Sequence, residues 1–91
     1  MLDKVLLRVL LPATQRTYEL RVSWDLDAGH VARLASTLLA AAERDRFVPS
    51  ARPALMLLEG SDAGRLLADD AVMRDFVADA TLTDGSTVAL V

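Results

Sequence analysis

Residues 17–23, Thr-Tyr-Glu-Leu-Arg-Val-Ser, alternate strictly between polar and apolar side chains. A period of two places Tyr18, Leu20 and Val22 on one face of an extended strand and the polar residues on the other. A strand of this kind is half buried and half wet. It is the clearest strand signal in the chain, and the rest of the fold is predicted around it.

A short apolar run, residues 5–11, precedes this strand. It is β-prone at Val5 and Val9 and closed by Pro12, which favours a strand over a helix. Residues 12–16 between the two runs are polar enough to form a turn. The sequence therefore predicts that the chain opens with a β-hairpin.

A helix is predicted to follow from residue 28 to about residue 44. Asp25 and Asp27 offer N-caps, since a carboxylate accepts backbone N–H groups there and faces the positive end of the helix dipole. Pro49 and Pro53 bracket a loop that cannot continue the helix, so its end is expected near Arg46. Apolar residues recur at helical spacing and are expected to pack on the strand face of Tyr18, Leu20 and Val22: Val31, Leu34, Ala35, Leu38, Ala41 and Ala42.

The second half of the chain predicts shorter elements. Residues 55–58 indicate a third strand, residues 60–64 a turn, and residues 66–67 a very short further strand. Residues 69–76 fit one or two helical turns. A tight turn over residues 83–86, with its Asp-Gly pair, leads to a last strand over residues 87–91.

The element order, β-β-α-β-β-β, predicts an α+β fold in which one helix packs across a four- or five-stranded mixed sheet. The first and last strands are the most apolar, so they are expected to pair in parallel at the centre. A length of 91 residues leaves room for one core, and residues 1–91 are expected to form a single domain.

Composition excludes several classes of function. The net charge is −3, which lacks the basic footprint of a nucleic-acid binder. There are no cysteines, so disulfides, thiolate metal ligands and a thiol nucleophile are absent. The apolar run at residues 5–11 is too short to insert in a membrane. We expect a cytoplasmic protein that reaches a membrane only when a partner recruits it.

In three stretches the sequence resembles the ubiquitin-like (β-grasp) superfamily. Residues 18–22 lead to a capping Asp27, and residues 55–60 are similar to the third strand and its following turn. The tail resembles the closing I-x-x-G-x-x-L-x-L pattern, with these residues in the matching places: Leu82, Gly85, Val88 and Leu90.

Within that superfamily the chain looks most like the YukD-like proteins, small bacterial ubiquitin-like proteins associated with type VII (ESX) secretion. It departs from shorter members in its Ala-rich helix and in residues 68–80. The chain starts with methionine and ends on Val91 without a Gly-Gly tail, so a complete and non-conjugated protein is expected. The resemblance implies a protein-binding adaptor or regulator, with a secretion-apparatus component as partner.

Two other functions stay open from the sequence. One is a modifier or sulfur carrier whose Gly-Gly tail is missing here. The other is a structural homo-oligomer, or a homodimer paired through its sheet face. An adjacent gene for an FtsK-like ATPase would favour the secretion association.

Candidate catalytic groups are weak, and no enzyme activity, cofactor or metal is predicted. His30 is the only histidine and is read as an exposed residue at the helix start, because an acid–base site needs a second converging group. Ser36 and Ser61 lack His–Asp partners. The glycines of residues 60–64 lack the lysine of a phosphate loop. No calcium-loop pattern accompanies the acidic residues of the second half, which are Asp69, Asp70, Asp75, Asp79 and Asp84.

Two features point to binding. Trp24 is expected to pack in the core at the top of the helix, and a partner-anchoring role is the alternative. The sheet face away from the helix is the stronger candidate, since an apolar patch on a domain surface marks an interface. Its predicted residues are Leu6, Arg8, Leu10, Met56, Leu58, Ala89 and Val91.

Overall fold

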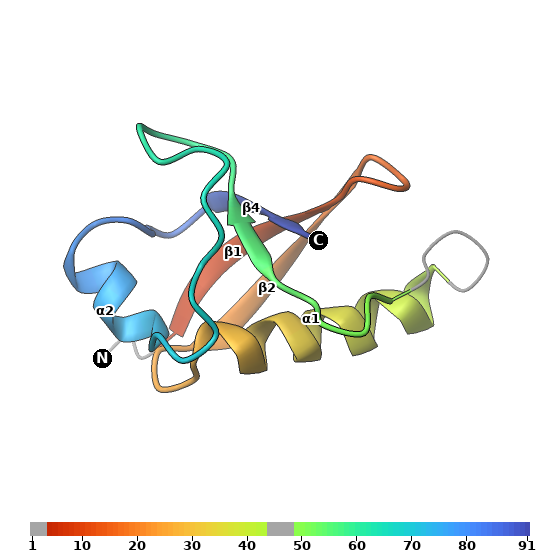
Figure 1. The fold of residues 1–91 in the computed structure, drawn as a ribbon, viewed down its shortest axis with the longest axis horizontal. Helices are drawn as coiled ribbons and strands as arrows, with labels where there is room; N and C mark the ends of the chain where they lie inside the picture. The colour runs from red at the N-terminus through yellow and green to blue at the C-terminus, as the bar shows by residue number, and fades with distance from the viewer. Residues whose placement is uncertain (1–3, 44–48) are drawn as a thin grey trace.

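A computed structural model describes residues 4–43 and 49–91. One long helix lies across one face of a sheet, and a short helix sits at one end of it (Figure 1). In chain order the elements are β1 (Lys4–Leu11), β2 (Arg16–Ser23), α1 (Ala28–Ala42), β3 (Leu55–Leu57), α2 (Met73–Ala78) and β4 (Ser86–Leu90).

The four strands form one mixed sheet in the order β2-β1-β4-β3. β1 pairs with β2 antiparallel over its whole length and with β4 in parallel, while β3 pairs with β4 antiparallel. The predicted hairpin and the parallel pairing of the first and last strands at the centre are confirmed. So is the α+β class, with one helix packed across a mixed sheet.

The core lies between the sheet and α1. Alternate residues of β1 are buried there, and the intervening ones face the other side. Val88 and Leu90 of β4 add to the same face, as predicted. Tyr18, Leu20 and Trp24 are partly buried and pack against this cluster, so Trp24 does contribute to the core.

The predicted inner face of α1 is confirmed at Val31 and Ala35, which are buried, but it is wrong at its other positions. Leu34 is 49% exposed and Leu38 is 56% exposed, and Ala41 and Ala42 are also exposed. Apart from Val31 and Leu39, the buried stripe is made of small side chains, which let the helix axis approach the sheet. Its members are Ala28, Gly29, Val31, Ala32, Ala35, Ser36 and Leu39.

Backbone contacts fix the start of α1. Asp27 is the N-cap, as predicted, and its carboxylate accepts a hydrogen bond from the His30 N–H at 2.7 Å. The Gly29 N–H donates to the Asp69 carbonyl at 2.9 Å. A Cβ on Gly29 would lie 3.1 Å from that oxygen, a tight contact that a larger residue could make only if the Asp69 backbone shifted by a few tenths of an ångström. The predicted helix end near Arg46 lies outside the described residues.

The segment before α2 differs from prediction. Residues 66–67 do not form a strand; Leu66 makes a single antiparallel bridge to Met56. The helical turns begin at Met73, not at Asp69, because residues 69–72 bond to the start of α1 instead. β4 covers Ser86–Leu90, one residue earlier than predicted, after a turn in which Gly85 has a φ of +87°.

Within the described residues, no helix combines the length and the apolar character that crossing a bilayer requires.

Candidate binding site on the outer sheet face

The outer face is the side of the sheet that points away from α1. Strand register brings its predicted residues together: Ala89 is paired with Leu10 on one side and with Met56 on the other. Leu6 and Arg8 continue the row along β1. These residues come from three strands that are distant in sequence, and the mixed topology alone makes them neighbours.

Exposure corrects part of this prediction. Ala89 is 1% exposed, and its short side chain lies between the longer Leu10 and Met56 in the strand register. Leu6, Leu10, Met56 and Leu58 are only partly exposed. Ala89 therefore forms the floor of the face and not part of its contact surface.

Two residues are the most exposed apolar groups on this side. Val91 is 41% exposed, and its backbone exchanges hydrogen bonds with Ala54 at 2.9 and 3.1 Å. Leu66 is 55% exposed, and its bridge to Met56 extends the outer face beyond β3. The sequence analysis did not predict Leu66 as part of this face. The signal is strand alternation: because Leu67 is buried, the neighbouring Leu66 points outward.

Charges border the apolar row on the β2 side. Arg8 is paired with Glu19, and Leu6 with Arg21, across the antiparallel β1–β2 ladder. Opposite charges on paired residues stabilise a sheet modestly and keep this half of the face wet. The outer face thus has an apolar half over β4 and β3 and a charged half over β2.

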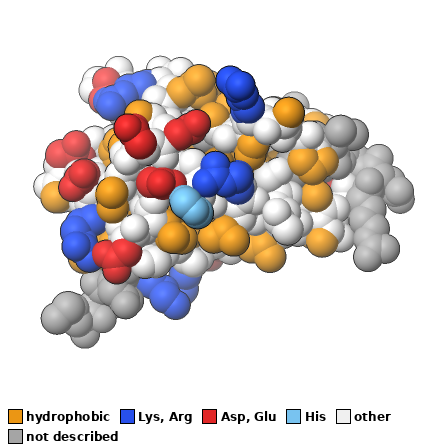
Figure 2. Space-filling model, turned by 60° about the horizontal axis from the view of Figure 1, so that its bottom comes forward, with side chains coloured by type: hydrophobic (Ala, Val, Ile, Leu, Met, Phe, Trp, Pro, Cys, Tyr) orange, Lys and Arg blue, Asp and Glu red, His pale blue; other side chains and the backbone are white. Residues whose placement is uncertain are grey.

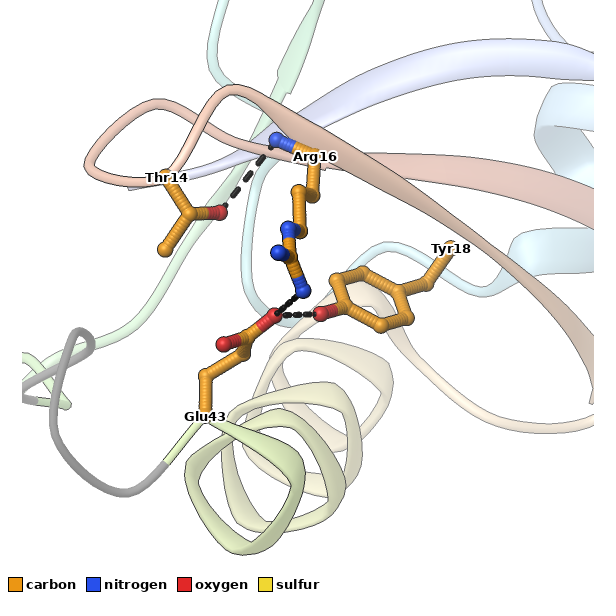
Figure 3. A network of polar contacts seen from close by, with 4 residues as sticks. All are labelled: Thr14, Arg16, Tyr18 and Glu43. Carbon is orange, nitrogen blue, oxygen red and sulfur yellow. Dashed lines mark hydrogen bonds and ion pairs between the residues drawn. The ribbon is translucent and has the colours of Figure 1, made fainter.

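A polar network ties the end of α1 to β2 (Figure 3). Glu43 is 7% exposed; the Arg16 guanidinium donates to its Oε1 at 3.1 Å, and the Tyr18 hydroxyl donates to the same oxygen. The hydrogen bond to Glu43 raises the pKa of Tyr18 above 10.0, and burial adds to the shift. These contacts hold the end of the helix against the strand.

Two further carboxylates, Asp27 and Asp79, accept local hydrogen bonds. His30 is exposed, and its Nδ1 lies 2.9 Å from the Asp27 carboxylate. Hydrogen bonds from His30 lower the pKa of Asp27, and hydrogen bonds from Thr81 lower that of Asp79. In the described part of the chain, no three His, Cys, Asp or Glu residues gather as metal ligands would. The Trp24 indole N–H is buried without a partner among these residues.

No protein-family model matches the chain, and no curated protein does. Solved structures match it over nearly its whole length. The ubiquitin-like domain of the Mycobacterium tuberculosis type VII secretion system protein ECCD1 has a TM-score of 0.70 at 17% identity, covering 99% of each chain. A chain of the ESX-5 inner membrane complex has a TM-score of 0.74 at 12% identity, covering 99% of this chain and 21% of that one. Caldiarchaeum subterraneum ubiquitin has a TM-score of 0.59 at 18% identity, covering 96% and 90%.

The chain has a ubiquitin-like fold. Identities this low establish the arrangement of helix and strands and not a shared activity. The helix α1 lies across one face of the sheet and leaves the other face without a helix (Figure 1). On this ubiquitin-like domain that face is the outer face described above. The outer face has an apolar area with a charged border, and this combination is typical of surfaces that bind other proteins.

Proposed function

We propose that this chain is a single-domain, non-conjugated bacterial ubiquitin-like protein that acts as an adaptor or regulator by binding another protein through its outer face. The observation that carries this proposal is the exposed apolar group of Leu66 and Val91, continuous with Met56 and Leu10. Partly exposed leucines around them complete a patch with a polar rim, which is the usual anatomy of an interface. The chain itself is not an enzyme in this proposal.

The partner proposed here is a component of a type VII secretion apparatus. Support comes from two structures of the same fold, the ECCD1 ubiquitin-like domain and a chain of the ESX-5 inner membrane complex. In this proposal the protein stays on the cytoplasmic side and its partner brings it to the membrane. The fold alone is compatible with other partners, so the test must identify the bound protein.

Affinity capture from the source bacterium tests both parts. A tagged chain is expected to recover a membrane secretion component, and Leu66→Glu or Val91→Glu is expected to reduce recovery by about fivefold or more, since each buries a charge in the interface. Asp70→Lys is the matched control on an exposed loop. If the outer-face variants recover as much partner as the wild type, the proposed binding surface is wrong. If the recovered protein is unrelated to secretion, the proposed secretion association is wrong.

A further inference from the structure

Among the described residues of the outer face, Met56 is the one that carries a thioether. Strand register pairs it with Ala89, and a bridge joins it to Leu66 on its other side. Its side chain is partly exposed, and the other large apolar side chains of this part of the face are leucines, at Leu10, Leu58 and Leu66. A thioether packs in an apolar surface much as leucine does, but it can also be oxidised to a polar sulfoxide. The apolar half of the face therefore holds one group whose polarity can change.

The rest of the chain offers an oxidant few alternatives. The sequence has no cysteine and three methionines, which are Met1, Met56 and Met73. Met73 is 0% exposed, because it packs in the core at the start of α2. Tyr18 and Trp24 also pack against the core. Within the described residues, Met56 is thus the sulfur-bearing side chain that a dissolved oxidant reaches first.

Oxidation at this position would change the face and leave the fold in place. The backbone bonds that cover the β3 edge come from residues 55 and 57 of that strand, and Met56 contributes none of them. Its cross-strand neighbours, Ala89 and Leu66, have no polar side-chain group that could bond a sulfoxide oxygen. A partner that covers Met56 would bury this oxygen without a donor from either neighbour, which opposes binding.

We propose that Met56 is a reversible oxidation site that releases the partner from the outer face. This inference rests on the proposed function, because the oxidised group lies on the surface assigned there to binding. The thioether sulfur attacks hydrogen peroxide, so that the O–O bond breaks, an S–O bond forms and the peroxide is reduced to water. In the reverse step two thiols supply the electrons to methionine sulfoxide reductases and become a disulfide, and the oxygen leaves as water.

The first measurement locates the oxidation. The purified chain is treated with hydrogen peroxide, and peptide mass spectrometry follows the gain of oxygen at each methionine separately. We expect oxidation at Met56 to be about tenfold faster than at Met73, since the buried side chain is reached only when the fold opens. The circular dichroism spectrum should stay that of the untreated chain. Equal rates at the two positions, or unfolding on oxidation of Met56, would overturn the proposal.

The second measurement compares the recovery of the secretion component before and after peroxide treatment of each variant. The oxidised wild-type chain should recover about tenfold less of it, since a polar group without a donor is buried in the interface. Treatment of the oxidised chain with reductases for both sulfoxide epimers should restore the recovery. Met56→Leu removes the thioether and keeps an apolar side chain, so peroxide should not lower its recovery below its own untreated level.

A thioether on the opposite side of the molecule is the matched control. Figure 2 shows hydrophobic side chains on the α1 side as well, beside the pale-blue histidine, and Leu34 of α1 is 49% exposed. The double variant of Met56→Leu with Leu34→Met therefore moves the oxidisable group from the outer face to α1. Peroxide should oxidise this variant at position 34 without lowering its recovery of the secretion component.

The two possible failures give different results. Equal recovery by the oxidised and the untreated wild type, or an equal loss on oxidation in the double variant, would overturn the oxidation site although the untreated chain still binds. If the untreated wild type recovers no secretion component, the proposed function fails and the oxidation site fails with it.

Discussion

Tyr18 and Glu43 join two elements through one carboxylate oxygen. The tyrosine must keep its proton to donate to Glu43, which is why its pKa lies above 10.0 in the folded chain. A raised folded pKa means that the stabilising contribution is complete below pH 10 and is lost as the pH rises through the raised value. The Tyr18–Glu43 contact therefore stabilises the fold fully at neutral pH.

Replacing Tyr18 by Phe tests this contact. We expect Tyr18→Phe to lower the thermal midpoint at pH 7 by about 4–8 °C, because one net hydrogen bond to a buried carboxylate is removed. The difference from the wild type should shrink above pH 10, as the tyrosine of the wild type ionises. A midpoint difference that stays constant from pH 7 to pH 11 in differential scanning calorimetry would contradict this role.

Asp27 acts at the other end of the same helix. Its pKa lies below 3.8 because the His30 N–H and ring donate to the carboxylate. The capping contact therefore stabilises the fold fully at pH values above 3.8, the ordinary pKa of the carboxyl group. This stabilisation is lost as the pH falls through the lowered pKa of Asp27 in the folded chain. We expect Asp27→Ala to lower the midpoint by about 4–8 °C at pH 7, with little difference left near pH 2. Asp70→Ala is the control; an equal loss there would contradict a specific capping role.

The structural roles of individual residues differ in how well the sequence alone predicts them. Asp27 is predictable because a capping pattern is local, four residues before the first apolar helix position. Glu43 is not, since its described partners lie 25 and 27 residues away and only the tertiary fold brings them together. Leu66 falls between these cases, because its alternation with Leu67 is local but its bridge to Met56 is not.

The rotation of α1 about its own axis is the main feature that sequence reasoning placed wrongly. Apolar residues occur at positions 31, 32, 34, 35, 38 and 39, so several helical stripes fit the pattern equally well. Close approach decides among them: Ala32, Ala35 and Ser36 face the sheet, and the larger Leu34 and Leu38 are turned outward. Periodicity counts apolar residues, whereas packing also depends on their volumes.

Alanine substitutions on α1 test this rotation. Leu39 is buried, so Leu39→Ala is expected to lower the free energy of unfolding by about 2–5 kcal/mol. Leu34→Ala and Leu38→Ala should change it by less than about 0.5 kcal/mol, because both side chains are largely exposed. Urea denaturation followed by circular dichroism gives all three values. If Leu34→Ala or Leu38→Ala lowers the free energy of unfolding as much as Leu39→Ala does, Leu34 and Leu38 face the core, as the sequence predicted.

The positions of the strands could be predicted from the sequence more readily than which edge of the sheet is covered. The hairpin and the final strand carry alternation or a β-prone apolar run bounded by a turn, and these signals are local. The coverage of β3 by residues 64–67 is not, since it depends on a loop returning beside its own strand. With β3 covered, β2 is the sheet edge that the described residues leave open, and this difference between the two edges could not be inferred from the sequence.

For the whole molecule, element order was enough to predict the ubiquitin-like fold. The three solved structures described above have identities of 12–18% to this chain, so the arrangement persists with few shared residues. Function does not follow in the same way, because it depends on which side chains occupy the exposed faces. In this chain the exposed apolar side chains of the outer face, Leu66 and Val91, are the residues from which a function is proposed.

Self-association is the competing use of the outer face. If that face serves a different protein, the chain alone should remain a monomer of 9.8 kDa at micromolar concentration in multi-angle light scattering. Leu6→Glu, Met56→Glu and Val91→Glu should leave this mass unchanged. A doubled mass that reverts to 9.8 kDa in those variants would instead assign the outer face to a homodimer.

Site-specific photo-cross-linking in living cells tests protein binding through the outer face most directly. A photoreactive residue is placed at Met56, on the face, or at Asp70, on an exposed loop away from it. We predict a cross-link from position 56 to a secretion-apparatus protein, and none to that protein from position 70. Equal cross-linking from both positions, or a product from position 56 with only twice the mass of the chain, would contradict a partner-binding outer face.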